Sequence, residues 1–232
     1  VDVELLPPER YRDERAGPAH SEAVAAAAAA LLRARRPVIV AGLGVGDSSA
    51  QAELLELAGM LSAAVVTSYC RNDVVPTEHP LVIGPIGRGG APEARTALQG
   101  ADLILAAGTR LAHFTTFYNH SVIPAGVPIV QIEIDPKEVG RNYPVEVGLV
   151  GDARETLRAL IAALRAREST WPRNREHLTD IAQRKRERAE RLASAERLDT
   201  VPIKPRRVYA ELRKVLPRDA IICVDGGTTI AP

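Results

Sequence analysis

The feature that most constrains the fold is a series of short, continuously apolar segments separated by segments of helical periodicity. The apolar segments cover residues 38–41, 64–68, 103–107, 129–134 and 147–150, and helical patterns cover residues 49–62, 91–98 and 153–167. A strand with one solvated face alternates apolar and polar residues, so continuous runs predict strands buried on both faces. The sequence therefore predicts an α/β fold, a doubly wound six-stranded parallel sheet, within residues 20–168.

The flanking segments predict three further parts. Residues 1–19 are rich in proline and charged residues and predict an extended linker. The next segment predicts a helix over residues 21–36, with Ser21 as its N-cap and Pro37 at its end. Residues 169–203 predict a charged helical linker, in which 173–197 form a solvated connecting helix because glutamates interleave with the arginines. Residues 204–232 predict the start of a truncated second domain, with a helix over 206–215.

The last residues predict a buried strand, 220–224, that runs into the turn Asp225-Gly226-Gly227-Thr228-Thr229. A strand that feeds a Gly/Thr-rich turn presents backbone N–H groups to phosphate, but it needs a following helix and neighbouring strands. We therefore expect the chain to be a fragment of a larger enzyme. We also expect the apolar residues Ile221, Ile222 and Val224 to dock on the sheet or on another copy, because bare strand edges are avoided.

Charge and cysteine content exclude several classes of protein. The 232 residues carry 30 Lys+Arg against 29 Asp+Glu, so no net field recruits nucleic acid or an anionic membrane. Two cysteines are too few for a disulfide framework or a metal knuckle. The sequence holds no apolar run near the ~20 residues of a membrane span. These observations predict a cytoplasmic protein.

The first predicted strand ends in a glycine-rich turn that contains Gly42, Gly44 and Gly46. A dinucleotide fingerprint requires a further glycine where this chain has Asp47, and no acidic residue ends the second strand, so a simple NAD dehydrogenase is disfavoured. Two interpretations stay open. The turn either lets the backbone approach a nucleotide or is merely a tight turn.

Three other strand ends carry candidate binding residues, at Gly108-Thr109-Arg110, at Asp135 and at Gly151-Asp152. Ligands of doubly wound sheets bind at the carboxyl ends of the strands, where an Arg pairs with phosphate and an Asp accepts from ribose hydroxyls. The alternatives are a solvated Arg and two helix-capping aspartates. We expect Arg110 to be the main cationic contact, with backbone N–H groups open around residues 42–46 and 108–110.

The sequence shows no catalytic constellation. His113 and His120 share a loop with aromatic residues, but nothing places a nucleophile beside a base. Cys70 follows Ser68 and Tyr69 without any indication of a group that would lower its pKa.

Taken together, the segments resemble the central domain of the thiamine-diphosphate enzymes related to acetolactate synthase. The resemblance rests on "RRPVIVAGLGVGDSSAQAELLELAGMLSAAVVTSY", "EHPLVIGPIG", "ADLILAAGTRL", "VPIVQIEIDPKEVGRNYPVEVGLVGDARETL" and "LPRDAIICVDGGTT". It covers nearly the whole chain in the expected order, and it is nearer to the sulfoacetaldehyde acetyltransferase and acetolactate synthase branches than to pyruvate decarboxylase. The resemblance implies a Rossmann-like domain.

The resemblance also implies a set of site residues. A groove that holds FAD in some members, an adenine nucleotide in others and nothing in the rest would be lined by Gly42, Leu43, Gly44, Thr67, Ser68, Gly108, Thr109, Arg110, Asp135, Gly151 and Asp152. Gly227, Thr228 and Thr229 would contact thiamine diphosphate. The activating glutamate and the metal-binding motif of the family would lie outside the chain, so no catalytic residue and no metal are expected here. The arginine-rich flavin contacts expected after "GTRL" are replaced by Ala112-His113-Phe114-Thr115, which puts FAD in doubt.

The resemblance implies a parent enzyme that depends on thiamine diphosphate and Mg²⁺, acts on 2-keto acids or related aldehydes, and forms a homodimer or homotetramer. In such an enzyme the cofactor supplies the chemistry and the protein positions it. The alternative is a non-catalytic nucleotide-binding module of the electron-transfer flavoprotein type, which shares the sheet. An NAD-consuming deacylase ranks last because the paired Cys-x-x-Cys zinc motifs are missing.

Overall fold

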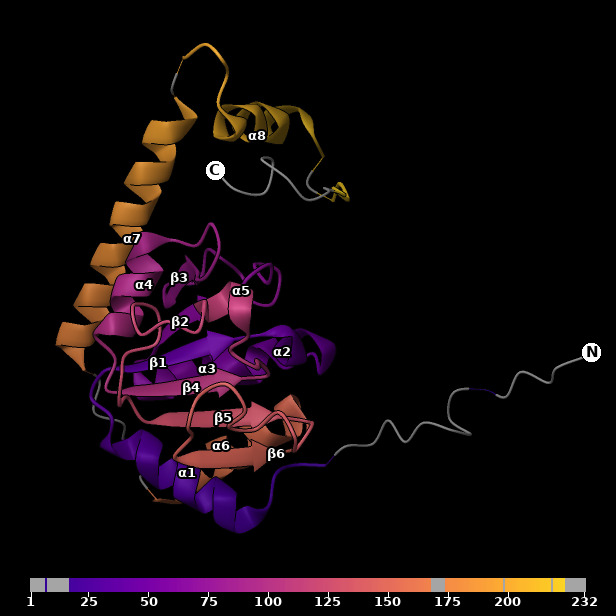
Figure 1. Ribbon diagram of the computed structural model, residues 1–232, viewed down its shortest axis with the longest axis vertical. Coiled ribbons are helices and arrows are strands. Elements are labelled where there is room, and N and C mark those ends of the chain that lie inside the picture. Colours follow the sequence, from indigo (N-terminus) through magenta and orange to yellow (C-terminus); the bar gives the residue numbers. More distant parts are fainter. Residues whose placement is uncertain (1–6, 8–16, 168–173, 198, 218, 224–232) are drawn as a thin grey trace, which may run out of the picture.

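The computed structural model describes residues 7, 17–167, 174–197, 199–217 and 219–223, and its centre is a six-stranded sheet (Figure 1). The strands are β1 (Pro37–Ala41), β2 (Ala64–Thr67), β3 (Val82–Pro85), β4 (Leu103–Ala107), β5 (Ile129–Glu133) and β6 (Val147–Val150). Every ladder is parallel and the strand order is β3-β2-β1-β4-β5-β6. The predicted doubly wound parallel sheet is confirmed.

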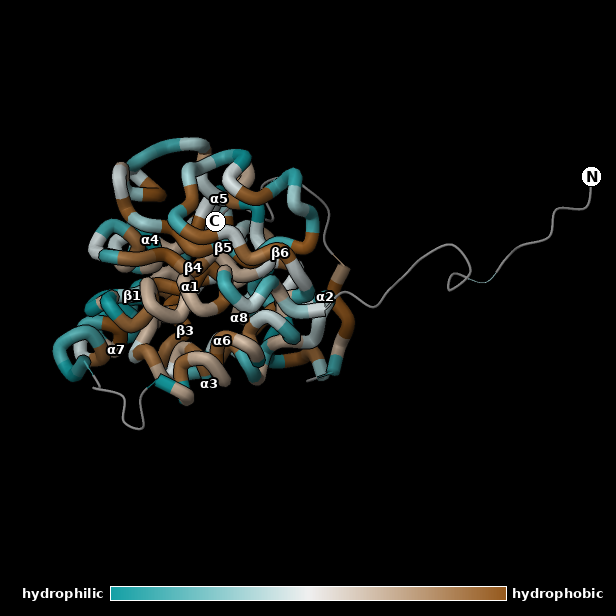
Figure 2. Tube along the Cα trace, turned by 90° about the horizontal axis from the view of Figure 1, so that it is seen from below, coloured by the Kyte–Doolittle hydropathy of each residue, from teal (hydrophilic) through white to brown (hydrophobic). Residues whose placement is uncertain are grey.

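The order places β1 at the centre, and the chain reverses direction across the sheet between β1 and β4. All residues of β1, β2, β4 and β5 are buried, which explains why these segments are apolar throughout. The brown, hydrophobic stretches of Figure 2 follow these strands. In doubly wound sheets the position where the strand order reverses forms a crevice at the carboxyl ends, and the strand order sets that crevice between β1 and β4.

Helices cover both faces of the sheet. They are α1 (Ser21–Arg33), α2 (Leu43–Asp47), α3 (Gln51–Leu61), α4 (Pro92–Gln99), α5 (His113–Thr116) and α6 (Ala153–Arg167). Helix α6 packs against α1 and α3, whereas α4 packs against β3 and the later helix α7. Figure 2 shows α3 and α6 on one side of the strands and α4 on the other.

The first helix differs from its prediction at both ends. Its N-cap is His20, without a side-chain cap, so the assignment of Ser21 as N-cap is wrong. The helix ends at Arg33 and not at Arg36, because the backbone N–H groups of Arg35 and Arg36 donate to the Asp102 carboxylate at 2.7 and 2.9 Å. These bonds draw the chain out of the helix and into β1.

Helix α7 (Arg175–Glu196) is solvated only on its outer face. Its inner face packs against α4 and β3 and buries His177 and Ile181 (Figure 1). At the edge of the sheet, the Lys185 ammonium donates to the backbone carbonyls of Thr77, His79 and Val82 at 2.7, 2.7 and 3.2 Å. The segment predicted as a connecting helix therefore also covers the β3 edge.

The predicted docking of the apolar tail on the sheet is wrong for residues 219–223, while docking on another copy stays a prediction. Helix α8 (Pro205–Val215) packs against α7, but residues 219–223 form no strand, and Ile221 and Ile222 are 93% and 61% exposed. Helix α7 packs against β3, the strand at this edge of the sheet, so this edge is already partly covered. Val224 and the turn at Gly227, Thr228 and Thr229 lie outside the described residues.

The buried His177 predicts a pH dependence of stability. Burial lowers the pKa of His177, its Nε2 lies 3.3 Å from the Pro37 carbonyl oxygen, and its Nδ1 has no partner. Below the unfolded-state pKa, near 6.5, the unfolded chain binds a proton that the folded chain takes up less readily. The free energy of unfolding therefore falls as the pH drops through this window.

We expect urea titrations at pH 7.5 and 5.5 to show this loss, and the loss to shrink in His177→Gln. Burial also lowers the pKa of His79, so both proteins are compared in a His79→Gln background. If the free energy of unfolding fell between pH 7.5 and 5.5 by the same amount with and without His177→Gln, the pH dependence would not come from His177.

Candidate nucleotide-binding groove

A groove of about 370 Å³ lies at the carboxyl ends of the strands, at the reversal between β1 and β4. It is lined by Leu43, Gly44, Asp47, Ser48, Ser68, Tyr69, Arg71, Gly108, Thr109, Arg110, Ile132, Glu133, Ile134, Gly151 and Ala153. Seven of the predicted site residues are in this lining: Leu43, Gly44, Ser68, Gly108, Thr109, Arg110 and Gly151. The strand ends thus bring together residues that are up to 108 positions apart in the sequence, from Leu43 to Gly151.

Two glycines allow the turns after β1 and β4 to touch. A Cβ on Gly42 would lie 2.5 Å from Thr109 Cβ and 2.9 Å from the Gly108 carbonyl carbon. A Cβ on Gly108, whose φ is +59°, would lie 2.7 Å from Gly44 Cα. No side chain fits at these distances. Gly42 packs against Gly108 and Thr109 and does not itself line the groove.

The expectation of open backbone N–H groups is wrong at Gly42, Gly44 and Gly108, and it stays a prediction for Leu43, Thr109 and Arg110. The amide of Gly42 donates to the Ala107 carbonyl at 2.9 Å, that of Gly44 to the Gly108 carbonyl at 3.0 Å, and that of Gly108 to the Ile132 carbonyl at 3.0 Å. Because these three amides already donate to backbone carbonyls, the glycines serve to let the two turns pack closely.

Three other predicted residues have mainly structural contacts. Thr67 is buried and its hydroxyl lies 3.3 Å from Asn72 Oδ1. The Asp135 carboxylate accepts from the Lys137 amide, which is an Asx turn. The Asp152 carboxylate accepts from the Glu155 amide at 3.0 Å as the cap of α6, and from the Ser48 hydroxyl at 2.6 Å.

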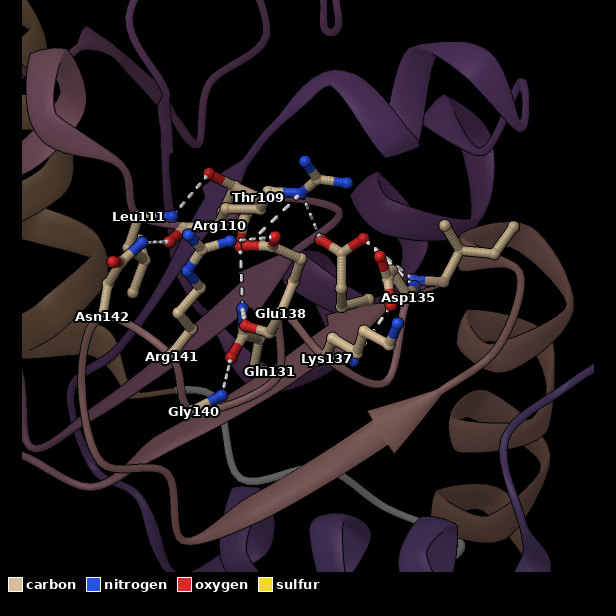
Figure 3. Close-up of polar contacts among 12 residues, drawn as sticks. Thr109, Arg110, Leu111, Gln131, Asp135, Lys137, Glu138, Gly140, Arg141 and Asn142 are labelled. Carbon is tan, nitrogen blue, oxygen red and sulfur yellow. Dashed lines mark hydrogen bonds and ion pairs between the residues drawn. The ribbon is translucent and has the colours of Figure 1, made fainter.

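The carboxylate that lines the groove at the end of β5 is that of Glu133, and not that of the predicted Asp135. Its Oε1 accepts from the amides of Ile134 and Asp135 at 3.2 and 3.3 Å, and its Oε2 lies 3.7 Å from Arg110 Nε. Figure 3 shows Arg110 extended over this region, with a second carboxylate, that of Glu138, 3.9 Å from its Nε. Arg110 is half exposed, so these loose pairs leave it free to contact a ligand.

A buried amide fixes the loop beside Arg110. Gln131 donates to the Thr109 carbonyl at 3.2 Å and accepts from the Gly140 amide at 2.9 Å (Figure 3). Both residues of β5 that face the loop, Gln131 and Glu133, are polar and two positions apart, which is the spacing of one strand face. That spacing was the signal by which the sequence could have identified Glu133.

Residues 17–19, predicted as part of the linker, pack against the segment that follows β6. The Ala19 amide donates to the Thr156 hydroxyl at 3.1 Å, and the Asp152 amide donates to the Gly17 carbonyl at 3.0 Å. A Cβ on Gly151 would lie 2.7 Å from the Ala19 nitrogen, so this position requires close backbone packing.

The two loop histidines and the acidic residues of the described part of the chain have the following surroundings. They contain no cluster of three or more His, Cys, Asp or Glu side chains able to hold a metal ion. His113 packs its ring against Phe114, Phe117 and Tyr118, and His120 Nδ1 lies 3.3 Å from the Ile123 carbonyl. None of the helices in the described part of the chain is both long and apolar enough to cross a membrane.

A six-stranded, doubly wound parallel sheet flanked by helices defines a Rossmann-like α/β domain, and comparison with known proteins specifies the family. Residues 24–160 match the model of the family described as "Thiamine pyrophosphate enzyme, central domain". The chain therefore belongs to this family.

Similar proteins carry the names of several different enzymes. The chain is 33% identical to the sulfoacetaldehyde acetyltransferase of Rhodobacter capsulatus, over all of this chain and 41% of that protein. It is 33% identical to the probable acetolactate synthase large subunit of Methanocaldococcus jannaschii, over 93% of this chain and 36% of that protein. It is also 33% identical to the glyoxylate carboligase of Escherichia coli O157:H7, over 82% of this chain and 32% of that protein. The chain thus spans about two fifths of the length of its curated relatives.

Proposed function

We propose that this chain is the central domain of a thiamine-diphosphate- and Mg²⁺-dependent enzyme that acts on a 2-keto acid or a related aldehyde. The family match supports the domain assignment, and the names of the relatives support the substrate class. Thiamine diphosphate would supply the chemistry next to the substrate carbonyl. This chain would contribute Gly227, Thr228 and Thr229 to the binding of its diphosphate. We include in the proposal a homodimeric or homotetrameric parent enzyme in the cytoplasm.

Within that enzyme we propose that the chain has a structural and nucleotide-binding role and no catalytic residue. The observation that carries this proposal is the groove at the reversal between β1 and β4, which combines a buried carboxylate, Glu133, with two arginines, Arg71 and Arg110. A carboxylate at a strand end accepts from ribose hydroxyls, and guanidinium groups pair with phosphate oxygens.

The size of the groove favours a small ligand. Its volume of about 370 Å³ lies near the lower end of the range for small-molecule sites, about 300–1,000 Å³. An adenine mononucleotide such as ADP suits this volume better than FAD does. The replacement of the arginine-rich flavin contacts after Arg110 points in the same direction.

Arg110→Ala is expected to weaken ADP binding by about tenfold. The charge-assisted hydrogen bond of an arginine is worth more in general, but here Glu133 and Glu138 already neutralise part of the Arg110 charge. Isothermal titration calorimetry measures the change. Arg141→Ala is the matched control, because this arginine pairs with Glu138 but does not line the groove. Equal ADP affinity in wild type and Arg110→Ala would contradict the proposed contact.

Two further measurements test the activity proposed for the full-length enzyme and the alternative that the chain is a flavin-binding electron-transfer module. Assays of the full-length enzyme with pyruvate, sulfoacetaldehyde and oxalyl-CoA are expected to show turnover that depends on added thiamine diphosphate and Mg²⁺. Thiamine diphosphate should not bind measurably to the 232-residue chain alone, which would contain only one turn of its site. A stoichiometric flavin absorbance band without thiamine dependence would instead favour an electron-transfer module.

A further inference from the structure

The inner face of α7 carries three cations at three-residue spacing, Lys185, Arg188 and Arg191. Ile181 on the same helix is buried, so this face points at the domain. Arg188 is partly buried and its guanidinium crosses the backbone of β3: a Cβ on Gly84 would lie 2.7 Å from Arg188 Nε. Gly84 has a φ of +144°, which L side chains rarely adopt. The glycine thus leaves room for a guanidinium against the sheet.

Two of the three cations have hydrogen-bonding partners within the domain. The Lys185 ammonium donates to three backbone carbonyls, as described above. The Arg191 guanidinium makes two hydrogen bonds to the Glu93 carboxylate, at 2.8 and 3.0 Å. Glu93 is largely buried, and this double contact lowers its pKa. The carboxylate that α4 offers to α7 is therefore already engaged by Arg191.

Arg188 has no such partner, and neither has Arg206 in the first turn of α8. Within the described residues, no hydrogen bond or ion pair reaches either guanidinium. Both side chains are partly buried, and the two helices that carry them, α7 and α8, pack against each other. Burial lowers the pKa of each guanidinium. The charges of Arg206 and Arg191 lower the pKa of Arg188 further and that of Arg191 lowers the pKa of Arg206, while Glu93 and Glu196 act in the opposite direction. The region between β3, α7 and α8 therefore holds an excess of desolvated positive charge.

We propose that Arg188 and Arg206 together bind a tetrahedral oxyanion, either inorganic phosphate or a phosphoryl group carried by a ligand. Two guanidinium groups provide planar forks that match pairs of phosphate oxygens, and an anion between them offsets their mutual repulsion. None of the residues involved lines the groove at β1 and β4, so this site is separate from the proposed nucleotide site. It does not depend on the proposed function of that groove.

Calorimetric titration of inorganic phosphate into the chain, in a chloride buffer of low ionic strength, tests the site. Arg188→Gln and Arg206→Gln are each expected to weaken phosphate binding by roughly 10- to 100-fold, the worth of a charge-assisted hydrogen bond. Arg186→Gln is the matched control, because it removes the same charge from the exposed face of α7. A variant that carries both Arg188→Gln and Arg206→Gln should not bind phosphate measurably. Undiminished phosphate binding in this double variant, or loss of phosphate binding in Arg110→Ala, would overturn the proposal.

A second measurement uses the wild-type chain alone, in case the variants fold poorly. Phosphate is expected to protect Arg188 and Arg206 from phenylglyoxal, read by peptide mass spectrometry, while Arg186 reacts at an unchanged rate. Protection by ADP at lower concentration than by phosphate would identify a phosphoryl group carried by a ligand, and equal or weaker protection would identify the free anion. Equal protection by acetate would show a carboxylate site, and absence of protection would show no anion site; either result overturns the proposal.

Discussion

Gly42→Ala is expected to lower the free energy of unfolding by about 2–3 kcal/mol, the usual effect of overpacking in a well-packed interior. The added Cβ would lie 2.5 Å from Thr109 Cβ, and the turns after β1 and β4 are tied by the hydrogen bonds of Gly42 and Gly44. The φ of Gly42 is −117°, which alanine adopts without strain, so the loss would be steric. Urea denaturation measures it. Because Thr109 and Gly108 line the groove, the same variant should also bind ADP more weakly.

The matched control is Gly59→Ala in α3. A Cβ at Gly59 meets nothing within 4 Å, and the position is exposed in a helix interior. This variant is expected to gain about 0.5–1 kcal/mol, because glycine loses more conformational freedom than alanine in a helix. If Gly42→Ala is as stable as Gly59→Ala, the two strand ends do not approach each other as closely as described.

The sheet could be predicted from the sequence because its strands are buried on both faces. Continuous apolar runs identified β1, β2, β4, β5 and β6 within one residue at each end. Six strands were predicted, but the sequence did not show where the sixth, β3, lies. Its four residues include Gly84 and Pro85, which are unfavourable in strands. Glycine is needed there because Arg188 lies across it, which is a tertiary contact that local patterns do not reveal.

The candidate site was predictable only in outline. Strand ends are visible in the sequence, so the glycines, Ser68 and Arg110 could be named as neighbours before the fold was known. Glu133 was missed in favour of Asp135, because the choice between them depends on which side chain points into the crevice and which closes a turn. The engagement of the glycine amides was also hidden, since it requires the distance between two turns 66 residues apart, at Gly42 and Gly108.

Ile181→Ala is expected to cost about 2–4 kcal/mol of stability, the usual effect of truncating a fully buried aliphatic side chain. Ile181 is 1% exposed and belongs to the apolar core, although it lies in the most highly charged segment of the chain. The ion pair of Arg36 with Asp180, at 2.7 Å, and the contacts of Lys185 lie on either side of it and hold α7 against the sheet. The loss should appear as a lower urea midpoint in a single cooperative transition.

The control is Arg186→Ala, which changes an exposed residue of the same helix and should stay within about 0.5 kcal/mol of wild type. A large effect of Ile181→Ala alone would show that α7 folds as part of the central domain. If both variants matched wild type, α7 would be a solvated connector, as the charge pattern alone suggests. That result would also remove the geometric basis of the anion site, because Arg188 reaches β3 only when Ile181 anchors the helix.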